Sequence, residues 1–354
     1  MKPLFQLTLL AATLVSPLAQ AVADTTVYVP LGSAGEVLVI DADRDTVVGT
    51  IADLPDVHGL ASAADGDYLV AGQYAGVTTG EAPVPTAPEG MSKAEHEAHH
   101  AKPAAPPSAP AEALSFVSVI RADDGSIVRR IEVPGAVHHT AVTPDGRHAV
   151  ATHPNQGGIS VIDLSAFRAL TTVETGPSAN YAVFGPDGGR VYVSNAGNNT
   201  VSEIDTRHWV VRRNFETGAS PEHMVLSPDG ATLYVNNVDD GTVSEISLRQ
   251  GTAVRTFEIG GALHGIDVSQ DGRTLFVSGR EENKLVAIEL ASGKMRSAPL
   301  APSPYHLAVI DGTGKLYVSS AEEPKLWVVD QESLRVLSEI PIRGEGHQMV
   351  VVQQ

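Results

Sequence analysis

Residues 180–206 read NYAVFGPDGGRVYVSNAGNNTVSEIDT, and residues 222–247 read EHMVLSPDGATLYVNNVDDGTVSEIS. In both stretches β-branched and aromatic residues alternate with polar ones, and Gly, Asp and Asn bound each run. This is the pattern of short β-strands, and we expect the second strands at residues 190–194 and 232–236. Asp-Gly pairs favour tight hairpins, and they recur at residues 145–146, 187–188, 229–230 and 271–272.

The unit recurs with a period of about 42 residues. Short strands in a repeat of this length are typical of the blades of a β-propeller. The repeats account for nearly all of the chain after a short leader, so the sequence predicts an all-β, seven-bladed β-propeller. The inner strands are expected to begin at His58, His139, Tyr181, His223, His264, His306 and His347.

The two ends of the chain complement each other. The C-terminal GHQMVVV supplies an inner strand with nothing after it, whereas residues 25–51 supply three strands with no inner strand before them. Together they predict one complete blade, closed by N- and C-terminal strands, which removes the exposed edges of the ring.

These repeats, with HTAVTPDGRHAVATH and NYAVFGPDGGRVYVSNAGNNTVSEIDT among them, resemble the YVTN/YncE-like β-propeller family. The resemblance covers nearly the whole chain after the leader. It implies the propeller fold but little about function, because this fold carries binding proteins, lactonases and metalloenzymes alike.

Composition and the N-terminus restrict the classes of function. Residues 1–21 combine Lys2, an apolar run and the small-x-small sequence Ala19-Gln20-Ala21, which predicts a cleaved signal peptide and a periplasmic location. Residues 22–354 would then form the propeller. The chain contains no cysteine, which excludes disulfides and thiolate metal sites. The formal net charge of −18 argues against nucleic acid as a partner. No later stretch suggests membrane insertion, and a monomer is expected.

An insert interrupts the first repeat at about residues 77–114. Its many Pro, Ala and Glu residues predict a disordered loop. His96, His99 and His100 cluster in it and suggest a weak, labile metal site. The loop after a second strand lies on the face where the inner strands begin. The insert should therefore share that face with the acidic pairs at 239–240, 281–282 and 322–323 and with His153.

The repeated histidine is the main functional signal. Equivalent inner-strand positions converge on the axis of a propeller, so repeated imidazoles become a ring around its channel. Neutral imidazole is a common ligand of Zn(II), and Cu(II) or Ni(II) are the alternatives. One ion needs only about four ligands, so a subset should ligate. We expect His58, His139 and His347 first, and then His306; the further candidates are His138, His223 and His264. A one-residue difference in register suggests that some of them point away from the axis.

An exported propeller without cysteine, with a histidine ring and a histidine-rich loop, is similar to the AztD-type periplasmic zinc metallochaperones. The resemblance implies a binding protein that delivers Zn(II) to the periplasmic zinc-binding protein of an ABC importer. Two alternatives stay open. One is a metal-dependent propeller enzyme, oxidase-like or lactonase-like, and the other is a YncE-type interaction scaffold that uses no metal.

Overall fold

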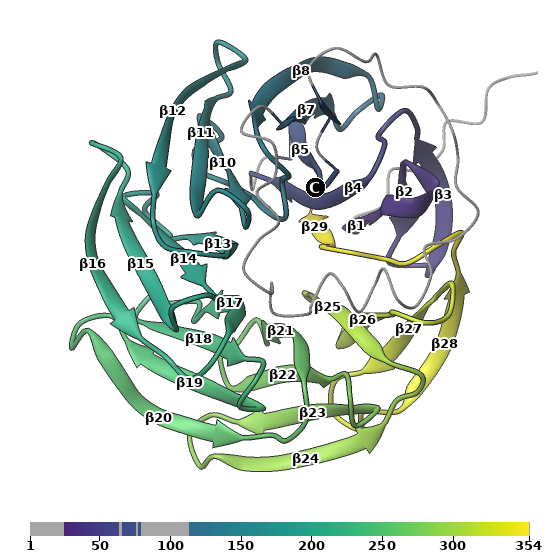
Figure 1. Ribbon diagram of the computed structural model, residues 1–354. Coiled ribbons are helices and arrows are strands. Elements are labelled where there is room, and N and C mark those ends of the chain that lie inside the picture. The colour runs from purple at the N-terminus through teal and green to yellow at the C-terminus, as the bar shows by residue number, and fades with distance from the viewer. Residues whose placement is uncertain (1–24, 64–65, 76, 79–112, 354) are drawn as a thin grey trace, which may run out of the picture.

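A computed structural model describes residues 25–63, 66–75, 77–78 and 113–353. Seven antiparallel sheets surround one axis like the blades of a wheel (Figure 1). The described residues contain no α-helix, only the short 3-10 helix η1 (Gly32–Ala34). The sequence-based prediction of an all-β, seven-bladed propeller is therefore confirmed.

Each blade is built from an inner strand, two middle strands and an outer strand. The inner strands, which define blades 1 to 7 in order, are β4 (Val57–Ser62), β9 (Thr140–Val142), β13 (Ala179–Phe184), β17 (Pro221–Leu226), β21 (Leu263–Val268), β25 (Pro304–Ile310) and β29 (Val350–Gln353). The second strands of the same blades are β5 (Tyr68–Gln73), β10 (His148–His153), β14 (Arg190–Asn195), β18 (Thr232–Asn237), β22 (Thr274–Gly279), β26 (Lys315–Ser320) and β1 (Thr25–Leu31).

The two remaining layers follow outward. The third strands, from blade 1 to blade 7, are β7 (Ala113–Arg121), β11 (Gly158–Asp163), β15 (Thr200–Asp205), β19 (Thr242–Ser247), β23 (Lys284–Glu289), β27 (Lys325–Asp330) and β2 (Glu36–Asp41). The outer strands are β8 (Ile127–Pro134), β12 (Arg168–Glu174), β16 (Val210–Glu216), β20 (Thr252–Glu258), β24 (Lys294–Pro299), β28 (Val336–Pro341) and β3 (Thr46–Ile51).

Blade 7 joins the two ends of the described chain. β29 pairs with β1 in antiparallel register, with Val351 opposite Val27 and Val352 opposite Thr26. In Figure 1 β29 lies beside β1 near the axis. The predicted closure of one blade by N- and C-terminal strands is confirmed, and it gives blade 7 its inner strand.

The turns between inner and second strands follow the Asp-Gly signal. Gly146, Gly188, Gly230 and Gly272 all have φ near +68°. Glycine adopts this left-handed conformation without a steric cost. In each turn the preceding aspartate accepts a backbone hydrogen bond, as Asp187 does from the N–H of Gly189 at 2.9 Å. These turns fix where each second strand starts.

The core lies between neighbouring blades. Val243 and Phe257 of blade 4, for example, pack with Leu275 and Val277 of blade 5 in one buried cluster. The apolar faces of both sheets are thereby removed from water, which is the main favourable contribution to folding.

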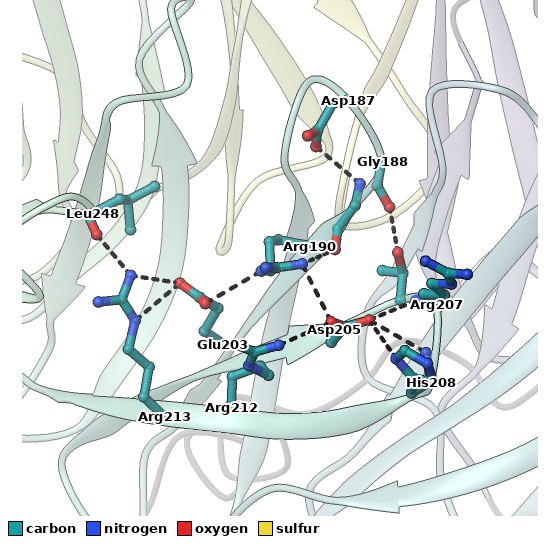
Figure 2. Close-up of polar contacts among 12 residues, drawn as sticks. Asp187, Gly188, Arg190, Glu203, Asp205, Arg207, His208, Arg212, Arg213 and Leu248 are labelled. Atoms are coloured by element: carbon teal, nitrogen blue, oxygen red, sulfur yellow. Dashed lines mark hydrogen bonds and ion pairs between the residues drawn. The ribbon is translucent and has the colours of Figure 1, made fainter.

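Arginines on outer strands tie one blade to the next. Arg213 of β16 donates to Glu203 of β15 at 2.8 Å and to the carbonyl oxygen of Leu248 in the next blade at 2.7 Å, as Figure 2 shows. One blade further, Arg255 makes the same pair of contacts, with Glu245 and Leu290. These contacts lie far from the axis and leave the channel to other residues.

The insert predicted at residues 77–114 is ordered at both ends. Strand β6 (Val77–Thr78) pairs with the start of β7, with Val77 opposite Leu114 and Thr78 opposite Ala113. These four residues at the approximate margins of the insert are therefore paired in strands. Residues 79–112, which include His96, His99 and His100, lie outside the described residues, as does the expected signal peptide at residues 1–21. No helix among the described residues is long and apolar enough to cross a membrane.

Candidate metal centre

A β-bulge opens most of the inner strands. On β17, Pro221 pairs with Asn237 and Met224 pairs with Val235, so Glu222 and His223 together face a single residue of β18. The same irregularity occurs in β13, β21 and β25, and a related one in β4. A bulge re-aims side chains that would otherwise alternate between faces. Two successive residues can therefore both approach the axis. The one-residue difference in register between the histidines of different blades does not turn their side chains away from it.

The bulges define two layers of residues around the axis. We call them the first and second axial positions, and strand register places one residue of each blade in each layer. The first axial positions, in order around the ring from blade 7, are His347, His58, His138, Asn180, Glu222, His264 and Tyr305. The second axial positions are Gln348, Gly59, His139, Tyr181, His223, Gly265 and His306.

The three histidines of the second axial layer come from alternate blades. His139, His223 and His306 lie on blades 2, 4 and 6, and their ligand nitrogens lie within 4.8 Å of one another. The Nε2 atoms of His139 and His223 are 3.2 Å apart. Two nitrogens bound to one tetrahedral zinc at about 2.1 Å lie about 3.4 Å apart. One pair of this central triad therefore has nearly the spacing of two ligands on one ion, and the third nitrogen lies within 4.8 Å of both.

The first axial layer is divided into two arcs. His347, His58 and His138 are neighbours on blades 7, 1 and 2, whereas Glu222 and His264 are neighbours on blades 4 and 5. Three further sets of ligand atoms within 4.8 Å arise where these arcs meet the second layer: His58 with His138 and His139, His58 with His306 and His347, and Glu222 with His223 and His264.

Two of the rings have a defined tautomer. Nδ1 of His58 donates to the carbonyl oxygen of His138 at 2.9 Å, and Nδ1 of His139 donates to that of Asn180 at 2.9 Å. A carbonyl oxygen can only accept, so in the neutral ring Nδ1 carries the hydrogen and Nε2 carries the lone pair. Metal-binding histidines typically have such a carbonyl partner, which fixes the orientation of the ring.

Burial keeps the ring of His139 uncharged. All seven histidines are at most 3% exposed. Desolvation, followed by the neighbouring His138, His223 and His306, holds the pKa of His139 well below its usual range. Burial also raises the pKa of Tyr305, to which Glu222 adds, and it raises the pKa of Asp267 on β21 to about 6. The ring of His139 is thus held in the neutral form that binds metals.

The seven histidines expected to line the channel, His58, His138, His139, His223, His264, His306 and His347, form one buried cluster, which we call the histidine cluster. The first-choice trio of His58, His139 and His347 does not form one of the ligand sets found among the described residues. His139 and His347 each share a ligand set with His58, but they belong to different sets.

Some residues of the centre were missed by sequence reasoning. Glu222, Tyr305 and Gln348 each stand directly beside a histidine, as His138 stands beside His139. This repeated pair of residues was the signal that could have identified them. Gln348 accepts hydrogen bonds from the N–H groups of Leu60 and Thr140, at 3.1 and 3.3 Å, and so links three blades.

Some of the acidic residues expected on the face of the insert accept hydrogen bonds from the backbone. Asp240 accepts from the N–H of Ala219 at 2.6 Å, and Glu281 accepts from that of Ala262 at 2.8 Å. His153 is buried. Its Nδ1 is hydrogen-bonded to the carbonyl oxygen of Ala136 at 3.0 Å, and its Nε2 to the hydroxyl of Ser160 at 2.8 Å. Both ring nitrogens of His153 are therefore engaged by the protein.

Comparisons with known proteins agree with the fold. The model of the family described as "Lactonase, 7-bladed beta-propeller" matches residues 175–323. The periplasmic gluconolactonase of Pseudomonas aeruginosa is 16% identical, with a TM-score of 0.69 over 93% of this chain and 99% of that one. A putative 6-phosphogluconolactonase from Bacteroides uniformis is 14% identical, with a TM-score of 0.72 over 93% and 99% of the two chains.

Kuenenia stuttgartiensis hydrazine synthase is 18% identical, with a TM-score of 0.66 over 86% of this chain and 97% of that one. At these identities the solved structures establish the fold alone. No curated protein matches the sequence significantly. Nothing in these comparisons supports the finer resemblance to the AztD-type or YncE proteins. The chain is similar to the lactonase family of seven-bladed propellers over residues 175–323 and shares its architecture.

Proposed function

We propose that the histidine cluster binds divalent metal ions, Zn(II) before Cu(II) or Ni(II). The observation that carries this proposal is the convergence of seven buried imidazoles in four overlapping ligand sets. A single buried histidine is readily explained as a structural residue. Seven from six blades, with Nε2 atoms as close as 3.2 Å, match the spacing of ligands around an ion far better than that of separate structural contacts.

The chemistry of the donors favours zinc. Imidazole nitrogens with a carboxylate suit Zn(II), Cu(II) and Ni(II), and the chain has no cysteine thiolate that would select Cu(I). The carbonyl oxygens that hold Nδ1 of His58 and His139 leave Nε2 of both rings as the donor. Neutral rings need not lose a proton before binding.

The test uses two histidines that between them belong to every ligand set, His58 and His223. The double variant His58→Ala/His223→Ala should lose tight Zn(II) binding in a titration against a competing chelator. His208→Ala is the control, because its side chain is 64% exposed in a turn between β15 and β16. Wild-type affinity in the double variant would overturn the proposal.

For the role of the ion, the family match over residues 175–323 and the gluconolactonase neighbours support a lactonase-like hydrolase over zinc delivery. The substrate class would be the cyclic ester of a sugar acid. When bound, a divalent ion supplies a Lewis acid for the ester carbonyl and lowers the pKa of a water molecule. The chain itself holds the rings of His58 and His139 in place through backbone carbonyls and buries the cluster. The periplasmic neighbour and the N-terminal sequence together support an exported location.

Hydrolysis of δ-gluconolactone, followed by acid release, distinguishes the two roles. The zinc-loaded wild type should accelerate it, and the metal-free protein and His58→Ala/His223→Ala should not. A loaded protein that hydrolyses no lactone, but passes its zinc to a metal-free periplasmic zinc-binding protein of an importer, would replace this proposal with delivery. In that case the tight site would stand and the enzymatic role would fall.

A further inference from the structure

The four ligand sets of the channel compete for shared histidines. The central triad of His139, His223 and His306 shares one member with each of the other three sets. The two sets that contain His58 exclude each other for the same reason. Only the set of Glu222, His223 and His264 has no member in common with the His58 sets. Since one ring nitrogen cannot serve two ions, the sharing limits how many ions fit.

We propose that the channel holds two divalent ions at once. One lies at His58, with His138 and His139 or with His306 and His347, and the other lies at a mixed site of Glu222, His223 and His264. This inference rests on the proposed metal-binding function. The central triad is then the site of a single ion, which must leave before two can be held.

The positions of the residues around the ring support a division into two sites. Asn180 on one side and Tyr305 on the other separate the arc of His347, His58 and His138 from the arc of Glu222 and His264 in the first axial layer. The two ions would therefore lie on opposite sides of the axis. The two sites are nevertheless close, since Nε2 of His223 lies 3.2 Å from Nε2 of His139 and Nε2 of His264 lies 3.3 Å from Nε2 of His306.

The carboxylate gives the second site a charge that the first lacks. Glu222 is 7% exposed, and burying an ionised carboxylate costs free energy that a nearby cation offsets. One carboxylate with two imidazoles is a known ligand set for zinc that leaves a position open. The carboxylate of the mixed site neutralises half of the charge of a dication. A second ion is therefore bound better there than at a site of histidines alone.

The ring of His264 is oriented by its surroundings. It stacks on Tyr305 with 3.8 Å between ring centroids and 19° between planes. The carbonyl oxygen of His264 accepts a hydrogen bond from Nδ2 of Asn236 at 2.6 Å. Asn236 lies on the neighbouring blade, opposite the bulge of Glu222 and His223, so this bond ties the backbone of His264 to that blade. The stacking and the backbone contact position the ring of His264, while its Nε2 atom lies 3.3 Å from Nε2 of His306.

The experiment counts zinc ions per molecule by native mass spectrometry during titration of the metal-free, full-length mature protein. The wild type should take up two. Glu222→Gln should take up one, and so should His58→Ala. The double variant Glu222→Gln/His58→Ala should still hold one, because the central triad survives in it. His58→Ala/His223→Ala should hold none.

Glu203→Gln is the matched control, because Glu203 is also buried but lies in the outer ion-pair network of Figure 2. It should hold two ions. Melting temperatures of the metal-free variants establish that each is folded, and His264→Gln replaces Glu222→Gln if that variant does not fold. Two ions in Glu222→Gln, or one ion of equal affinity in both wild type and Glu222→Gln, would overturn the two-ion inference while metal binding stands. No ion in the wild type would overturn the proposed function itself.

Discussion

The Nε2 atoms of His139 and His223 lie 3.2 Å apart, although the residues are 84 positions apart in the chain and come from blades 2 and 4. At this distance one ring must donate its N–H to the lone pair of the other, since two lone pairs would repel. A metal ion would replace that shared hydrogen and engage both lone pairs. The propeller therefore holds the two donors close to their ligating positions, and little rearrangement is needed to bind.

Gly59 and Gly265 are predicted to set this geometry. A Cβ at Gly59 would lie 2.7 Å from Cα of His139, and one at Gly265 would lie 2.7 Å from N of Leu307, next to His306. These neighbours are backbone atoms that cannot move aside cheaply. Gly59→Ala and Gly265→Ala should each displace a ligand strand, lower Zn(II) affinity about tenfold or more, and cost about 1–3 kcal/mol of unfolding free energy.

Zinc affinity from chelator competition and stability from urea unfolding measure the two effects. Gly49→Ala is the matched control on an outer strand, because its Cβ would meet Val39 at an ordinary 3.5 Å. If both axial variants bound zinc like Gly49→Ala, the close approach would have no part in positioning the histidines.

The fold could be predicted from the sequence because its signals are local and repeated. The Asp-Gly turns and the alternating strands occur in almost every unit, and the complementary ends indicated the closed blade. The gathering of the histidines followed from the same symmetry. Which of them share a site could not be predicted, because that depends on bulges that bring two successive residues to the axis. Glu222 and Gln348 were missed because each replaces a histidine of the pattern, and only the register equates them.

Gln348 is predicted to stabilise the closed ring of blades. Its side chain accepts from the N–H groups of Leu60 and Thr140 and donates to the carbonyl of Thr140 at 3.1 Å. Gln348→Ala leaves these buried groups without a partner, and each such group costs about 1–3 kcal/mol. We expect a loss of about 2–4 kcal/mol in urea unfolding, whereas Gln353→Ala on the exposed end of β29 should change little. Equal stability of the two variants would contradict this role.

Removal of residues 79–112 should leave the propeller intact. Thr78 and Ala113 face each other in an antiparallel ladder, so a two-residue Asn-Gly turn can join them as a hairpin. The melting temperature should stay within a few degrees of the wild type, and the zinc count of the channel should be unchanged. A shortened protein that fails to fold, or that loses the tightest zinc, would show that the insert contributes to the core or to the cluster.

His153 is predicted to make the protein sensitive to acid. Burial lowers its pKa to about 4 in the folded protein, from the usual value near 6.5. Its Nδ1 donates to the carbonyl of Ala136, and its Nε2 accepts from Ser160 at 2.8 Å. Between pH 6.5 and pH 4 His153 binds a proton in the unfolded chain but not in the folded protein. Stability should therefore fall as pH falls through this window, by up to about 3 kcal/mol from this residue.

His153→Asn tests the assignment, because asparagine occupies the equivalent position on two other blades. Asn195 and Asn237 donate to Ser202 and Ser244 at 2.9 Å, and the side-chain amide introduced by His153→Asn should donate to Ser160 in the same way. The variant lacks the titrating ring, so its unfolding free energy should decline less than that of the wild type between pH 7 and pH 4. The other buried histidines are common to both proteins and cancel in the difference, and His208→Asn controls for the loss of an exposed ring. Parallel curves for wild type and His153→Asn would mean that the folded protein accepts the proton at His153 as readily as the unfolded chain does.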